Sequence, residues 1–280
     1  MESALSEPQP PSRVSAPEIA PGFWAGAASV FRGIAFLLRT PATWLPATVP
    51  TALLAALTAV LVWLSVSRVE PLVATWLPEP TEWYARLGVE FLSWLAAALT
   101  ALLGFVLALA VTPPLSAPAL EKIVGQRERD LGAPERPPLG FWAEVWCGLK
   151  SQASVALFAS PILLLLWLAD LLLPIAAVVT VPLKCVVLSA ALAWNLFDYP
   201  LTLRGVGMRD RLAVLNTHWR PTLGFGLAFS VLFWIPCFGV VLLPVGVVAA
   251  TDVVWAILRS DPQARARLPA LVPETAARTS

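Results

Sequence analysis

The chain has 280 residues, of which 58% are hydrophobic and 13% are charged, and its mean hydropathy is +0.75. About a quarter of a soluble domain is normally charged. A chain of this composition cannot cover its apolar surface in water, so its solvent is expected to be lipid. The net charge of +1 lacks the basic excess that phosphate binding needs. We therefore expect an all-α integral membrane protein that binds no nucleic acid.

The first 20 residues are rich in Pro and Ser and carry Glu2 and Glu7, with no apolar core directly after them. This pattern predicts a disordered tail, not a signal peptide. We expect a tail over 1–20, one membrane domain over 21–259 and a second tail over 260–280. Sixteen arginines against three lysines suggest a high-GC bacterial genome, and hence the bacterial cytoplasmic (inner) membrane.

The first structured element is expected between Gly22 and Leu38, where apolar residues recur at helical spacing. Ser29, Arg32, Gly33 and Arg39 fall on or near the opposite face. The pattern predicts an amphipathic helix that lies flat at the membrane interface.

Two long runs then contain no charged residue, Thr40–Ser67 and Phe91–Leu120. Both exceed the ~20 residues that cross a bilayer, so each predicts a full transmembrane helix. Each run also has three prolines near one end, where the helix should bend because proline removes a backbone donor. These prolines are Pro41, Pro46 and Pro50 in the first run, and Pro113, Pro114 and Pro118 in the second.

The next apolar stretch, Ser151–Phe197, is broken by Asp170, Pro174, Pro182 and Lys184. The last one, Thr222–Thr251, is free of charge but is interrupted by Pro236, Gly239, Pro244 and Gly246. Each predicts a Pro-broken helical hairpin that returns to its starting side. Halving the second stretch gives arms of about 15 residues, or roughly 22 Å, against a hydrocarbon core of about 30 Å. We expect half-inserted hairpins, with Cys237 near the second turn buried. Such a turn is tolerated where protein covers it or water lines it.

Charge in the loops predicts the orientation. Segments 121–150 and 198–220 hold five and four basic residues, whereas 68–90 holds two basic and four acidic ones. By the positive-inside rule both basic loops and both termini are cytoplasmic.

Motifs for catalysis are missing from the sequence: no Walker loop, GxGxxG, HExxH or GxSxG is present. Three widely spaced cysteines and the single His218 offer no metal-ligand spacing. We expect neither an enzyme nor a metal or cofactor site.

Polar groups inside the apolar stretches are costly in lipid and therefore informative. The residues concerned are Asp170, Lys184, Asn195, Asp198 and Asp252. They either line a polar pathway or pin the hairpins, with Lys184 snorkelling or paired with Asp170. The second role is the more favoured for Asp198 and Asp252. We also expect a buried contact between the two hairpins, with Lys184 neutralised there by Asp170.

The order of elements resembles the CysZ sulfate-permease family, also called the etoposide-induced-protein family. The likeness spans roughly Gly22 to Arg259 and rests on these segments: Ser116-Ala117-Pro118-Ala119-Leu120-Glu121, Asp198-Tyr199-Pro200, Gly224-Phe225-Gly226, Ile235-Pro236, Leu243-Pro244 and Ala249-Ala250-Thr251. The resemblance implies two full transmembrane helices, two half-inserted hairpins, a homo-oligomer and sulfate entry into the cytoplasm.

One stretch departs from the family pattern. Its sulfate permeases carry Pro-Gly-x-Arg-Arg where the first transmembrane helix begins, but this chain has Pro41-Ala42-Thr43-Trp44-Leu45. The nearest cationic donors are Arg32 and Arg39, which we expect, with Thr43, to contact the anion instead.

Two functions follow. The first is a membrane protein of the CysZ type that passes sulfate or another small anion. The alternative is a non-transporting membrane scaffold that binds partners through its cytoplasmic loops.

Overall fold

The computed structural model describes residues 22–76, 82–134, 140–233 and 238–267, and no strand occurs among them. The predicted all-α fold is confirmed. The helices are α1 (Phe23–Arg39), α2 (Trp44–Trp76), α3 (Trp83–Leu115), α4 (Ala117–Asp130), α5 (Phe141–Leu172), α6 (Ala177–Leu203), α7 (Met208–Thr217), α8 (Trp219–Phe233), α9 (Phe238–Ser260) and α10 (Pro262–Arg267), with 3₁₀ turns at Pro41–Thr43 and Pro174–Ala176.

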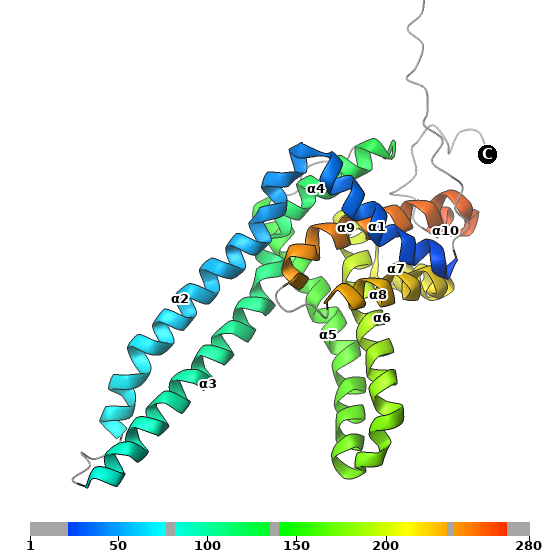
Figure 1. The fold of residues 1–280 in the computed structure, drawn as a ribbon. Coiled ribbons are helices and arrows are strands. Elements are labelled where there is room, and N and C mark those ends of the chain that lie inside the picture. The colour runs from blue at the N-terminus through cyan, green and yellow to red at the C-terminus, as the bar shows by residue number, and fades with distance from the viewer. Residues whose placement is uncertain (1–21, 77–81, 135–139, 234–237, 268–280) are drawn as a thin grey trace, which may run out of the picture.

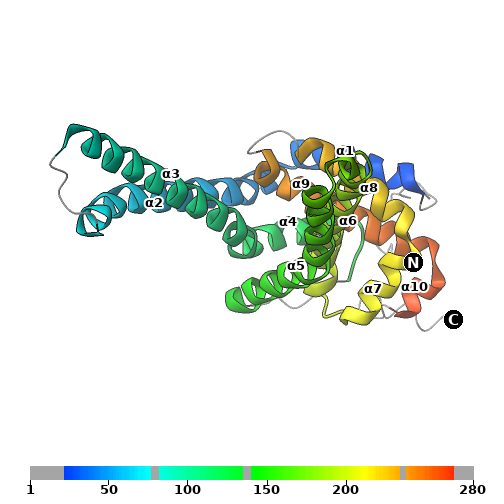
Figure 2. The same ribbon diagram turned by 90° about the horizontal axis from the view of Figure 1, so that it is seen from below.

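Two long helical hairpins extend from one packed head (Figure 1). Helices α2 and α3 form the first hairpin and α5 and α6 the second, while α1, α4 and α7 to α10 make up the head. The hairpins leave the head in the same general direction and diverge from each other, as the view from below also shows (Figure 2). Their free ends therefore reach the same side of the molecule, as the predicted orientation requires.

Within the described residues, five helical stretches are long and apolar enough to cross a membrane. They are Pro41–Val69, Trp83–Leu115, Phe141–Leu172, Pro174–Leu203 and Leu242–Ser260. At 1.5 Å per residue, the 33 residues of α3 extend about 50 Å, well beyond a core of about 30 Å. The two predicted full transmembrane helices thus have the length that crossing needs.

The α5–α6 hairpin is longer than its predicted half-insertion requires. Its arms have 32 and 27 residues and turn at Pro174–Ala176, so the predicted break at Pro174 is confirmed. The expected breaks at Asp170, Pro182 and Lys184 are wrong, because Asp170 lies inside α5 and the other two inside α6. Pro182 lies in the second turn of α6, and the helix continues past it without the one hydrogen bond that its missing N–H would have made. Half-insertion of this hairpin stays a prediction, and its arm lengths also allow a full crossing.

The α8–α9 pair has unequal arms, which corrects the expected division into two arms of about 15 residues. Helix α8 has 15 residues, or about 22 Å, whereas α9 has 23 and continues past Thr251 to Ser260. The helix continues through Asp252, whose carboxylate is paired with Arg127. Residues 234–237 lie outside the described residues, so the predicted burial of Cys237 stays a prediction.

Helix α1 has the predicted bounds but a different division of its faces. Trp24, Phe31 and Leu38, spaced seven residues apart, form an exposed apolar stripe, which suits contact with lipid. Ser29 and Gly33, expected on the polar face, are instead buried where α1 packs on α8 and α9. Small residues allow this close approach: an ideal Cβ on Gly33 would lie 2.8 Å from the Val245 carbonyl oxygen.

The core of the head joins the two predicted hairpins, α5–α6 and α8–α9. Phe225 of α8 packs between Phe197 of α6 and Phe229, with ring centroids 5.0 Å and 5.6 Å apart. All three side chains are fully buried. The expected buried contact between these hairpins is therefore confirmed.

Residues after α9 add one further packed element. Helix α10 lies in the stretch predicted as a C-terminal tail, and its Ala264 is buried. Just before it, Asp261 Oδ2 lies 3.2 Å from Nε2 of His218. This contact brings the start of α10 next to the α7–α8 junction.

Candidate functional site

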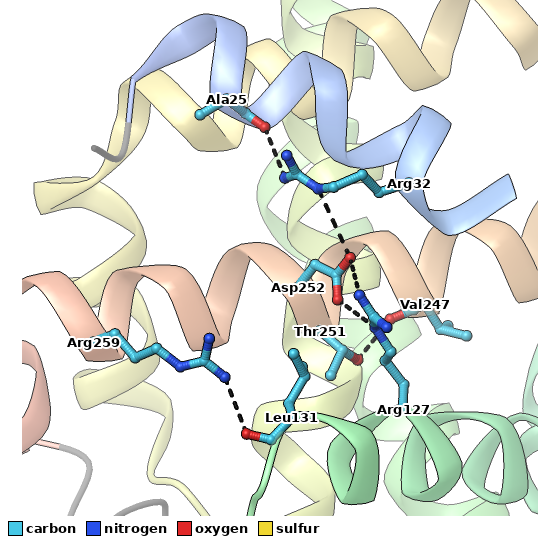
Figure 3. Close-up of polar contacts among 8 residues, drawn as sticks. All are labelled: Ala25, Arg32, Arg127, Leu131, Val247, Thr251, Asp252 and Arg259. Carbon is cyan, nitrogen blue, oxygen red and sulfur yellow. Dashed lines mark hydrogen bonds and ion pairs between the residues drawn. The ribbon is translucent and has the colours of Figure 1, made fainter. Parts of the chain in front are cut away.

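Three charged side chains from distant parts of the chain meet in the head (Figure 3). Arg127 donates from Nε to Asp252 Oδ1 at 2.6 Å and from Nη2 to Oδ2 at 3.0 Å. Arg32 approaches the same carboxylate from the other side, with Nε 3.9 Å from Oδ2. The bidentate geometry of Arg127 is the stronger contact, so Arg127 holds Asp252 and Arg32 is only loosely bound.

Each member of this Arg32–Arg127–Asp252 cluster stands on a different helix, α1, α4 and α9 respectively. The guanidinium of Arg127 also lies 4.8 Å from the ring centroid of Phe36 on α1, within cation–π range. Arg259 lies seven residues, or two helical turns, beyond Asp252. It donates to the carbonyl of Leu131, just after α4, at 3.0 Å. These contacts fix α4 across α9 and beneath α1.

The cluster carries more positive than negative charge, because two guanidiniums share one carboxylate. The Asp252 side chain is 6% exposed, that of Arg127 20% and that of Arg32 34%. Arg32 also donates from Nη2 to the Ala25 carbonyl at 3.3 Å, a long hydrogen bond. A partly exposed and weakly held guanidinium beside a neutralised pair is a place where a small anion can bind.

In the turn that leads into α2, where the family pattern has two arginines, the side chains of Thr43 and Trp44 donate hydrogen bonds to nearby backbone carbonyls. The Thr43 hydroxyl donates to the Thr40 carbonyl at 2.7 Å, and the Trp44 indole N–H donates to the Leu37 carbonyl at 2.8 Å. Both carbonyls, at and just after the end of α1, also accept backbone N–H groups, at 3.0 Å for Thr40 and 3.4 Å for Leu37, so the two side chains reinforce this turn. Thr43 is also buried, and the structure does not bring it together with Arg32.

Arg39, the other predicted anion contact, ends α1 and is exposed. It lies seven residues after Arg32, about 10 Å along the helix axis, so it shares that side of α1 without joining the cluster. A cation in the last turn is favourable there because of the helix dipole.

Asp198 has a structural environment, as the favoured interpretation predicts. Its carboxylate accepts from Arg211 on α7 and from the Thr202 hydroxyl, and the residue is 1% exposed. The contact pins the end of α6 to α7. Asp252 likewise pins α9, although its partners Arg127 and Arg32 also make it part of the cationic cluster.

Asn195 lies deeper in the domain and bonds across to α5. Its Nδ2 donates to Gln152 Oε1 at 3.2 Å. Gln152 and its buried neighbour Ser151 were not among the predicted site residues. Both precede the apolar part of α5, where composition alone does not distinguish a buried polar side chain from a water-facing one.

Lys184 pairs with Asp170, as predicted, and Asp170 also accepts from the Thr180 hydroxyl. The pair joins α5 to α6 within one hairpin, however, so its predicted place between the two hairpins is wrong. Each side chain is about one-fifth exposed. The pair neutralises two charges within an apolar hairpin, where a lone charge in contact with lipid would be costly.

We expect Lys184→Met to lower the yield of folded protein several-fold, because Asp170 then keeps its charge without a cation. Adding Asp170→Asn should restore most of that yield, since the second change removes the stranded charge. Fluorescence-detected size-exclusion chromatography of the singles and the double variant measures this recovery. Losses that simply add would show that the two charges do not depend on each other.

Comparison with protein-family models matches residues 29–244 to the family described as sulfate transporter CysZ/etoposide-induced protein 2.4. A search among curated proteins found no match. The matched range runs from within α1 to within α9 and includes both long hairpins. Since it covers most of the chain, the chain belongs to the family of sulfate transporter CysZ and etoposide-induced protein 2.4.

Proposed function

We propose that the protein passes a small anion, with sulfate as the first candidate, across the cytoplasmic membrane. The observation that carries the proposal is the Arg32–Arg127–Asp252 cluster, with its unbalanced positive charge and its partly exposed Arg32. Membership of a family that includes sulfate transporters supports the same function. Homo-oligomer formation and cytoplasmic termini are part of the proposal.

The geometry suggests how the cluster would work. Arg127 keeps Asp252 engaged through two short hydrogen bonds, so an arriving anion competes only for the 3.9 Å contact of Arg32. An anion leaving water needs compensating cationic donors. Arg32 supplies them, and Arg39 attracts the anion to this side of α1.

Replacing Arg32 and Arg39 together by Gln should reduce sulfate flux to background, because the entrance loses both cations that are free to bind. Uptake of labelled sulfate into proteoliposomes of purified protein measures this, and Arg39→Gln alone should lower uptake less than Arg32→Gln. Arg220→Gln is the matched control, since Arg220 is exposed and stacks on Trp219 outside the cluster.

Wild-type uptake in the double variant would exclude this entrance site. No uptake by the wild-type protein would instead favour the alternative, a scaffold that binds partners through its cytoplasmic loops.

A further inference from the structure

A small cavity lies where five helices of the domain meet. Its volume is about 30 Å³, and its walls come from α3, α4, α5, α6 and α9. The polar residues on its wall are Ser151, Gln152, Asn195 and Tyr199, and the wall also includes Pro113 and Pro114 of α3. No charged side chain is among its lining residues in the described part of the chain.

Ser151 lacks a partner in this cavity. The residue is 5% exposed, and its hydroxyl oxygen makes no hydrogen bond to the described protein atoms. Buried hydroxyls are nearly always hydrogen-bonded, because an unpaired one loses its contacts with water. A hydroxyl on the wall of a polar cavity therefore indicates a ligand that occupies the cavity.

Neighbouring groups offer further contacts to such a ligand. The bond from Asn195 to Gln152 uses one donor and one acceptor, which leaves the second half of each amide able to bind. Pro113 and Pro114, on the α3 side of the wall, lack N–H groups and so add no backbone donor to it. The site thus combines neutral donors and acceptors.

Size and charge decide what the cavity holds in the described conformation. Its volume is that of about two waters, since one needs roughly 10–15 Å³, and sulfate does not fit. Neutral donors suit a passing anion, because conduction requires binding weak enough for the ion to leave.

The cavity and the cationic cluster lie on the same two helices. On α9, Val247 lines the cavity and Asp252 follows five residues later, about 8 Å along the axis. On α4, Leu120 lines the cavity and Arg127 follows seven residues later, on the same face. The cavity and the Arg32–Arg127–Asp252 cluster are therefore joined along one face of α4.

We propose that this cavity is the hydrated constriction of the anion pathway, closed in the described conformation, with Ser151 and Asn195 as its donors. The proposal rests on the proposed function and adds to it the place where the pathway narrows. Opening must separate α5 and α6 from α3 and α9 enough to admit an anion larger than the two waters.

An anionic thiol reagent tests the constriction. In a background with Cys147, Cys185 and Cys237 replaced by Ala, Ser151→Cys is exposed to a sulfonate-bearing methanethiosulfonate in proteoliposomes. Ala153→Cys is the control, because Ala153 lies two residues away and is exposed on the outer surface of α5, where lipid disfavours the reactive thiolate. Labelling of both sites and sulfate uptake are measured together.

We expect Ser151→Cys to react at least about tenfold faster than Ala153→Cys, sulfate to slow that reaction, and modification to block uptake. The constriction would be overturned if the background protein takes up sulfate normally while Ser151→Cys does not react and Asn195→Leu leaves uptake unchanged. That result would leave the proposed function intact. Absence of uptake in the background and the wild-type protein would overturn both.

Discussion

Glu128→Gln should lower the free energy of unfolding by about 3–5 kcal/mol, the range found when one partner of a buried ion pair is removed. Glu128 Oε1 accepts from Arg204 Nε at 2.9 Å, and the two side chains are only 5% and 3% exposed. Arg204 also donates to the Pro134 carbonyl and lies over the ring of Trp255. The guanidinium cannot leave for solvent, so it would stay buried without its counter-charge.

The substitution keeps the size of the side chain and one acceptor oxygen, so the loss reports the charge. Thermal or denaturant unfolding of the detergent-solubilised protein measures it. Asp130→Asn is the control on the same helix, because Asp130 is exposed and its replacement should change stability by no more than about 0.5 kcal/mol. Equal effects at the two positions would contradict the buried pair.

The second large effect is expected where α1 meets α8. An ideal Cβ on Gly224 would lie 2.0 Å from the Phe23 carbonyl oxygen, and one on Gly26 would lie 2.0 Å from the Pro221 carbonyl oxygen. Both obstacles are backbone atoms, which cannot turn aside as side chains do. Gly224→Ala should therefore force the helices apart and cost about 1–3 kcal/mol or more, as overpacking does.

The pair of glycines provides its own test. Gly26→Ala and Gly224→Ala should each lower the free energy of unfolding. The double variant should lose less than the sum of the two single losses, because moving the helices apart once relieves both overlaps. Gly88→Ala is the matched control, since no atom lies within 4 Å of a Cβ there, and alanine should stabilise α3 by up to about 1 kcal/mol. Wild-type stability in Gly224→Ala would show that α1 does not pack this closely.

Features that depend on local composition could be predicted from the sequence. The bounds of α1, the two charge-free helices and the turn at Pro174 follow from periodicity, length and proline. Lys184 was paired with Asp170 because a lone charge in an apolar stretch is costly, and the two residues lie only 14 positions apart. In each case the deciding interaction is close along the chain.

Features that depend on distant helices could not be predicted in the same way. Arg127 was counted only as a basic loop residue, yet it lies 125 residues from its partner Asp252. Ser29 and Gly33 were assigned to a polar surface, because nothing nearby in the sequence shows that α8 and α9 cover them. Burial of Ser151 likewise requires knowing that α3 and α9 meet α5 at that level.

The separation of Arg32 from Asp252 has a consequence for biogenesis. Each long hairpin pairs helices that are neighbours along the chain, so it can form as soon as its second arm leaves the ribosome. Arg32 must wait for residue 252, on the order of 10–40 s at ordinary elongation rates of about 5–20 residues per second. During that interval α1 has neither α8 nor α9 to cover its inner face. Its apolar stripe of Trp24, Phe31 and Leu38 can already contact lipid. This contact keeps α1 at the membrane until α9 is synthesised and packs against it.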